Sequence, residues 1–145
     1  MEDPYNLQRF TDAQDTVYAD VLIELKHGQK RSHWMWFIFP QLKGLGRTDT
    51  ARHFGIASLQ EARAYLDHAV LGPRLRECTR LVLQIEGRSA HQMFGSPDDL
   101  KFRSCLSLFA AAAPEGKLFQ DALDKFYAGE PDPLTAAALG ISKPG

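Results

Sequence analysis

Two stretches of this chain combine side chains that could bind a ligand or transfer a proton. The first runs from Lys30 to Arg47 and the second from Gly95 to Ser104. Imidazole, carboxylate, ammonium and aromatic groups all occur there, and binding sites and acid–base catalysts are built from such groups. We therefore take the candidate site residues from these two stretches.

The first stretch is aromatic. Trp34 and Trp36 could form a wall for a planar ligand, while Gln41 would supply a hydrogen-bonding amide. His33 is the titratable group beside them and a candidate catalytic acid or base. The alternative is structural, because large rings provide much of the burial in a small domain and each indole N–H can bond to a buried acceptor. The residue types leave both interpretations open.

A loop with two glycines follows the aromatic residues. In Gln41-Leu42-Lys43-Gly44-Leu45-Gly46-Arg47 the backbone could turn its N–H groups toward an anion, with Lys43 and Arg47 adding positive charge. The loop lacks the Lys-Ser/Thr pair of a P-loop and the third glycine of a dinucleotide fingerprint. An exposed loop explains the same residues, so the anion site is a prediction without a motif behind it.

The second stretch mixes charges and a hydroxyl group at the start of an expected helix. Asp99 is the candidate catalytic partner of His33, and either Asp99 or Asp98 could act as a general base or bind a hydroxyl group. Lys101 would hold an anionic group and Ser104 would form a hydrogen bond to the ligand. Helix capping and surface ion pairs, each worth about 0.3–1 kcal/mol, also explain this composition.

Other kinds of site find less support. The five histidines show no H-x-x-x-H spacing and the two cysteines show no C-x-x-C, so we expect neither a metal nor a cofactor. Lys and Arg total 17 against 18 Asp and Glu, giving a net charge of -1. The one basic run, residues 26–31, covers a single helix end, so we do not expect nucleic acid as a partner.

Capping residues, helical periodicity and terminating Gly or Pro recur along the chain. They predict a mainly α, compact single-domain fold of about six helices, at residues 11–28, 58–70, 73–87, 96–113, 118–129 and 132–140. The segment Trp34–Phe39 stays unresolved, because a short apolar run fits a short helix and a buried extended segment equally.

Length and composition predict one domain over residues 1–145. At 44% hydrophobic and 24% charged residues, the chain has the composition of a globular protein. Its longest apolar run, Trp34–Phe39, is far shorter than the roughly 20 residues that a membrane helix needs. The first residues contain no basic-then-apolar signal. We therefore expect a cytoplasmic protein without membrane segments, with both cysteines as buried thiols.

Three blocks carry a resemblance to a known family: residues 32–41 (SHWMWFIFPQ), 71–75 (LGPRL) and 94–101 (FGSPDDLK). With them the chain resembles, over nearly its whole length, the bacterial family called domain of unknown function 1810. The resemblance implies a compact, largely helical fold and brings no established activity, so it assigns no catalytic residue. The label calpastatin, which some members carry, does not fit, because calpain-inhibitor segments are disordered repeats and this chain has a core composition.

Two functions are compatible with these observations. The first is a pocket for a small anionic molecule, nucleotide-like or phosphorylated, with hydrolysis of a glycosidic bond as the reaction to test. It requires the two polar stretches to meet at one cavity. The second is a non-catalytic protein-interaction module, in which the rings of residues 34–39 form an exposed partner surface. The sequence does not indicate an oligomeric state.

Overall fold

Ten helices account for most of the chain in this computed structural model, which describes residues 3–113 and 116–140, and these residues form no β-strand. The helices are α1 (Gln8–Asp15), α2 (Tyr18–Lys26), α3 (Met35–Ile38), α4 (Asp49–Phe54), α5 (Leu59–Asp67), α6 (Leu71–Leu83), α7 (Ala90–Phe94), α8 (Asp98–Ala112), α9 (Leu118–Tyr127) and α10 (Pro133–Leu139). The predicted mainly α fold is confirmed. The number exceeds the predicted six because the first predicted helix is two helices and because the short helices α3, α4 and α7 add three more.

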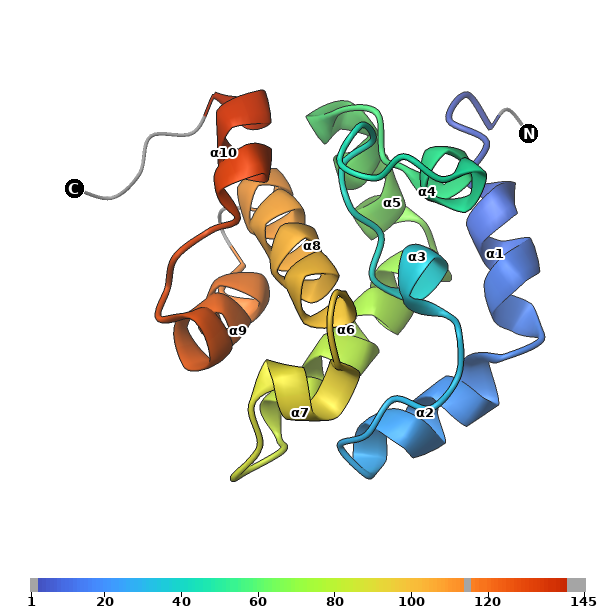
Figure 1. The fold of residues 1–145 in the computed structure, drawn as a ribbon. Helices are drawn as coiled ribbons and strands as arrows, with labels where there is room; N and C mark the ends of the chain where they lie inside the picture. Colours follow the sequence, from blue (N-terminus) through green and yellow to red (C-terminus); the bar gives the residue numbers. More distant parts are fainter. Residues whose placement is uncertain (1–2, 114–115, 141–145) are drawn as a thin grey trace.

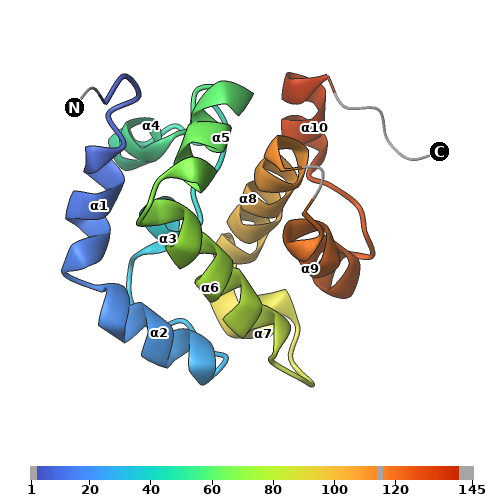
Figure 2. The same ribbon diagram turned by 180° about the vertical axis from the view of Figure 1, so that it is seen from behind.

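Helix α8 runs through the middle of the molecule, between the α9–α10 side and the side formed by α1, α4 and α5 (Figures 1 and 2). Helices α3, α5, α7, α9 and α10 all contact it. Its buried residues occur on every side, as in a helix surrounded by others. The two buried serines donate their hydroxyls to carbonyls one turn earlier, so they cost no unpaired polar atom.

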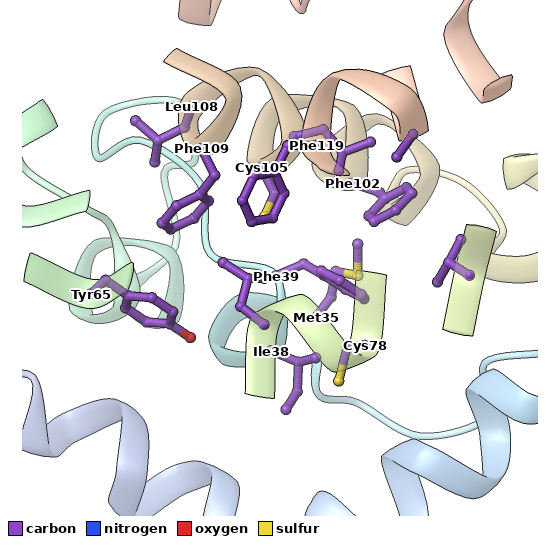
Figure 3. Close-up of a cluster of buried hydrophobic side chains, with 14 of the residues drawn as sticks. Met35, Ile38, Phe39, Tyr65, Cys78, Phe102, Cys105, Leu108, Phe109 and Phe119 are labelled. Carbon is purple, nitrogen blue, oxygen red and sulfur yellow. The ribbon is translucent and has the colours of Figure 1, made fainter. Parts of the chain in front are cut away.

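The hydrophobic core lies around α8 and draws side chains from α3, α5, α6 and α9 (Figure 3). The Phe39 and Phe102 ring centroids are 4.8 Å apart, and those of Tyr65 and Phe109 are 5.4 Å apart. Both cysteines are buried thiols in this core, as expected. The helices therefore pack as a single compact domain.

The predicted helix 11–28 is in fact two helices, α1 and α2, with a break at residues 16–17. Thr11 and Gln14 have the spacing of a capping box, but Thr11 does not cap a helix, because its hydroxyl donates to the carbonyl of Gln8 inside α1. The Gln14 amide bonds instead to the Phe37 carbonyl and the Tyr65 hydroxyl. The capping pattern at Thr11 was thus a coincidence of residue types, since Gln14 is needed in the core.

The unresolved segment Trp34–Phe39 contains the one-turn helix α3, and Trp34 accepts its first backbone hydrogen bonds. Helix α4, which the sequence analysis did not predict, is capped by Thr48, whose hydroxyl accepts from the Ala51 N–H. Both are too short to be stable alone, so packing on the core maintains them. In the described part of the chain, no helix has the length and apolar character required to cross a membrane.

Candidate functional site

A hollow of about 260 Å³ lies where the loop after α3 meets the first turns of α8 and the start of α10. Its polar lining residues are Gln41, Lys101, Ser104 and Asp132. Gln41 and Lys101 also line a much narrower hollow of about 10 Å³ beside Trp36. The structure thus brings residues from both predicted stretches to one place, although some sixty residues separate them along the chain.

Backbone pairing and a close contact position the loop at residues 41–46. The Lys43 N–H donates to the Ile56 carbonyl at 2.7 Å, and the Ile56 N–H donates to the Gln41 carbonyl at 2.9 Å. A Cβ on Gly46 would lie only 2.5 Å from the Cβ of Ala51 on α4. This glycine is therefore explained by close packing on α4, and the predicted role in cradling an anion is not needed to account for it.

One carboxylate links two lysines at the edge of the hollow. Asp98 Oδ2 lies 2.8 Å from Lys30 Nζ, and its Oδ1 lies 3.4 Å from Lys101 Nζ. Each ammonium also lies over an indole ring, Lys30 at 5.2 Å from the Trp34 ring centre and Lys101 at 4.5 Å from that of Trp36. Two ammonium groups share one carboxylate, so this group of side chains keeps a net positive charge beside the hollow.

Trp36 and Trp34 therefore differ in role. The face of the half-buried Trp36 ring carries the Lys101 ammonium, so Trp36 holds this cation at the edge of the hollow. Trp34 is only 1% exposed and belongs to the core, which leaves no face for a ligand. Trp34 therefore fits the structural interpretation, in which the ring provides burial in the core.

Glu24 is the buried acceptor that the Trp34 indole requires. Its Oε1 accepts from the Trp34 Nε1–H at 3.0 Å and from the N–H groups of Arg31 and Ser32. Its Oε2 accepts from the Ser32 hydroxyl at 2.7 Å. Burial raises the pKa of Glu24, but these four hydrogen bonds outweigh it and hold the pKa below its usual value. A charged Glu24 thus positions the start of the first polar stretch.

The predicted catalytic pair does not line the hollow. His33 is exposed, and it is absent from the lining of both hollows, as is Asp99. Asp99 Oδ2 lies 3.3 Å from Nδ1 of a different histidine, His91, and its Oδ1 accepts from the Leu100 N–H. A joint catalytic role of His33 and Asp99 therefore stays a prediction that this hollow does not support.

The other predicted ligand-binding residues separate into two groups. Gln41, Lys101 and Ser104 line the hollow, whereas Lys43 and Arg47 are exposed on its loop and do not line it. Asp98 does not line the hollow either, but its carboxylate lies 3.4 Å from the Lys101 ammonium. The hollow thus contains residues of both predicted segments, whereas Lys43 and Arg47 stay predictions that its lining does not support.

Sequence reasoning missed Asp132 and the apolar edge of the hollow. Asp132 was interpreted only as the start of the last helix, and its side chain does cap α10 by accepting from the Thr135 N–H at 2.9 Å. Leu45, Leu100 and Leu134 also line the hollow. The signal available in the sequence was a leucine at a position that the helical pattern leaves exposed. Only the packing of α10 on α8 brings these residues together.

Among residues 3–113 and 116–140, no group of three metal-binding side chains could hold an ion.

Comparison with known proteins identifies the family. No curated protein matches the chain. A crystal structure of the conserved hypothetical protein Rv1873 from Mycobacterium tuberculosis is 52% identical in sequence, with a TM-score of 0.94. The match covers 97% of this chain and 100% of the other. Residues 4–139 match the family described as "Protein of unknown function (DUF1810)". The chain therefore belongs to the DUF1810 family, as the three sequence blocks indicated.

Proposed function

We propose that this protein binds a small anionic organic molecule in the hollow between the loop at residues 41–46, α8 and the start of α10. The observation that carries the proposal is that Gln41 and Lys101, from the two polar stretches, line one hollow. A cavity lined by apolar side chains with a few convergent polar groups is the usual form of a small-molecule site.

The charge at Lys101 supports an anionic ligand. Its ammonium is 3.4 Å from an Asp98 carboxylate that Lys30 approaches more closely, at 2.8 Å. The side chain of Lys101 keeps 22% of its surface exposed. A phosphate or carboxylate can therefore reach this ammonium without first breaking a tight ion pair.

The proposal concerns binding. Hydrolysis of a glycosidic bond would need an acid and a base within hydrogen-bonding reach of the substrate. Asp132 is the carboxylate among the lining residues of the hollow, and His33 and Asp99 are outside that lining. A nucleotide-like ligand and its hydrolysis thus stay predictions.

A thermal-shift screen of phosphorylated metabolites and nucleotides tests the proposal. A compound at one hundred times its Kd should add about 2.7 kcal/mol to the free energy of unfolding. The Lys101→Met substitution should weaken binding roughly tenfold or more, because hydrogen bonds to charged groups contribute about 1.5–3 kcal/mol.

The matched control is Lys125→Met, which also removes a lysine from an ion pair, with Glu86, and from an aromatic ring, that of Phe126, but contacts neither Asp98 nor the hollow. It should lower the melting temperature and leave Kd unchanged. The proposal fails if no compound stabilises the protein, or if both lysine variants bind the identified compound as tightly as the wild type does.

An interaction surface is the second candidate function, and one observation favours it. Leu100 and Leu134, both on the edge of the hollow, are 54% and 67% exposed. The prediction of an exposed partner surface at residues 34–39 loses support, because Trp34, Ile38 and Phe39 are buried. An apolar edge of this kind suits a protein partner.

A second copy of the chain is the simplest partner to test. If the edge binds another copy, the sedimentation of the wild type should depend on its concentration, and a Leu100→Lys, Leu134→Lys variant should stay monomeric. Equal monomeric behaviour of both proteins would remove self-association through this edge.

A further inference from the structure

The hollow has two chemically unlike ends. We infer that it takes a molecule with an anionic group at Lys101 and a hydrogen-bond donor, either a hydroxyl or an ammonium group, at Asp132. This inference rests on the proposed binding function and adds the distribution of charge along the ligand. Asp132 is the residue that the sequence indicated only as the start of the last helix.

Lys101 and the start of α10 lie at different levels along the axis of α8. The Asp132 N–H donates to Ser107 Oγ at 2.8 Å, which places the start of α10 at the level of Ser107. Ser107 follows Lys101 by six residues, and at 1.5 Å per residue these levels are roughly 9 Å apart along the helix axis. The Lys101 side chain reaches toward Asp98, three residues earlier on α8, which takes its ammonium farther from the level of Ser107. Ser104 lies between the two ends.

Only one oxygen of the Asp132 carboxylate is used within the protein. Oδ2 accepts from the Thr135 N–H at 2.9 Å and from the Thr135 hydroxyl at 2.8 Å. In the part of the chain that the structure describes, no hydrogen bond ends on Oδ1. Helix capping requires a single acceptor, and serine would supply it. The second oxygen is therefore available to a donor on a ligand.

The same charges disfavour a ligand that is negative at both ends. A molecule that is negative at both ends would face the Asp132 carboxylate, and like charges repel at this range. The apolar residues of the lining, Leu45, Pro97, Leu100 and Leu134, suit a short carbon chain. At about 260 Å³ the hollow is slightly smaller than typical ligand pockets. The ligand class is thus a small phosphorylated or carboxylated alcohol or amine.

Calorimetric titration of the full chain with three phosphate monoesters of similar length tests the inference. Propyl phosphate has only the anionic end, glycerol 3-phosphate adds hydroxyl groups, and phosphoethanolamine adds an ammonium group. We expect at least one of the last two to bind about tenfold more tightly than propyl phosphate, the contribution of one hydrogen bond to a charged group. Whichever of these two compounds binds more tightly shows whether Asp132 accepts from a hydroxyl or from an ammonium group.

Two substitutions then locate the preference. Asp132→Ser keeps an N-cap acceptor for α10 and removes the second oxygen, whereas Asp132→Asn keeps both the shape and the cap. Asp132→Ser should abolish the tenfold preference without weakening propyl phosphate. Asp132→Asn should abolish a preference for ammonium but retain part of a preference for hydroxyl. Glu130→Gln removes a nearby charge that does not line the hollow and should change nothing.

The outcomes separate the two proposals. Equal binding of all three compounds to the wild type, or a preference that survives in Asp132→Ser, would overturn the inference and leave the binding function intact. Absence of binding by all three, with no effect of Lys101→Met in the metabolite screen, would overturn both. Circular dichroism of each variant confirms that α10 is retained.

Discussion

Glu24 shows how one buried acid can order a segment of polar and aromatic residues. Its carboxylate accepts from four donors on residues 31–34, including the Trp34 indole N–H. Without it, the two backbone N–H groups and the indole would be left without an acceptor in a site where Glu24 itself is only 8% exposed. The residue matters to the hollow indirectly, because the segment it holds leads into α3 and the loop at residues 41–46.

Substitution of Glu24 should separate the effect of hydrogen bonding from that of charge. Glu24→Ala leaves three N–H donors without an acceptor. It should lower the free energy of unfolding by about 3 kcal/mol or more, because each such group costs about 1–3 kcal/mol. Glu24→Gln keeps an amide oxygen for these donors and should cost about 1–2 kcal/mol. Urea unfolding at pH 7 measures both, and equal costs would show that an uncharged amide oxygen does not replace the carboxylate as acceptor.

The charge of Glu24 also makes stability depend on pH. Its pKa in the folded chain lies below the usual value of 4.5, so its stabilising effect is present above pH 4.5 and is lost as the pH falls through the folded pKa. Glu24→Gln does not titrate. The difference in unfolding free energy between wild type and Glu24→Gln should therefore shrink below about pH 4.5. A difference that stays constant from pH 7 to pH 3 would contradict this.

At the scale of elements, short helices and a tight loop shape one wall of the hollow. Helix α4 is six residues long, and the loop at residues 41–46 lies against it through Gly46 and Ala51. The bridge between Leu42 and Ile56 ties the same loop to the chain beyond α4. Local propensity contributes little to such short elements, so their stability comes from contact with the rest of the fold.

A double-mutant cycle at Gly46 and Ala51 tests this contact. Gly46→Ala would place two Cβ atoms 2.5 Å apart, and such overpacking costs about 1–3 kcal/mol. Ala51→Gly alone costs about 1 kcal/mol through lower helix propensity. The double variant removes the clash, because the next contact of the new Cβ is an ordinary 3.6 Å. We expect it to be more stable than the sum of the single effects predicts by about 1 kcal/mol.

Denaturant titrations of the three variants provide the measurement. Purely additive effects would mean that contact with the Ala51 Cβ does not cause the cost of Gly46→Ala. If the loop shapes the hollow, Gly46→Ala should also weaken any ligand found in the screen, and Ala51→Gly should restore that binding in the double variant.

At the scale of the whole molecule, α8 joins the core to the candidate site. One end of the helix contributes Leu100, Lys101 and Ser104 to the hollow, and its buried residues beyond them pack against α5 and α9. The helix that carries the cation beside the hollow thus also contacts five other helices of the fold. Such an arrangement holds site residues rigidly, because core packing restricts the helix that bears them.

The two thiols report on the stability of this core. Cys78 on α6 and Cys105 on α8 are 1% and 0% exposed. Burial raises the pKa of the Cys78 thiol to about 12 and that of Cys105 well above its usual value. At pH 8 both should therefore react with a thiol reagent only upon global unfolding, at one common rate.

Mass spectrometry of partly labelled protein checks this expectation. Doubly labelled and unlabelled chains should predominate at every time point when labelling of the unfolded chain is fast. A population labelled at one cysteine alone would show that α6 or α8 opens independently of the other. Cys78→Ala and Cys105→Ala variants assign the two rates.

Several features of the fold were predictable because their causes are local. The pair Ser89 and Gln92 forms a capping box at α7, and Asp132 caps α10, as their spacing indicates. Gln14 and Trp34–Phe39 were ambiguous for a different reason. Gln14 has the same position in a capping box as in a buried network, and a short apolar run has no period of its own. Contacts with Phe37 and Tyr65 decided the first case, and packing on α8 decided the second.

By itself the sequence determined the helical class and the family, and it singled out the two segments that meet at the hollow, because these depend on composition and spacing along the chain. Only the tertiary structure decided which side chains meet: Lys101 with Gln41 and Asp132 around a hollow, Asp99 with His91, and Trp34 with Glu24 inside the core. The physical reason is that helix periodicity specifies which face is buried but not which helix covers it. The neighbour across each face depends on the packing of the whole chain.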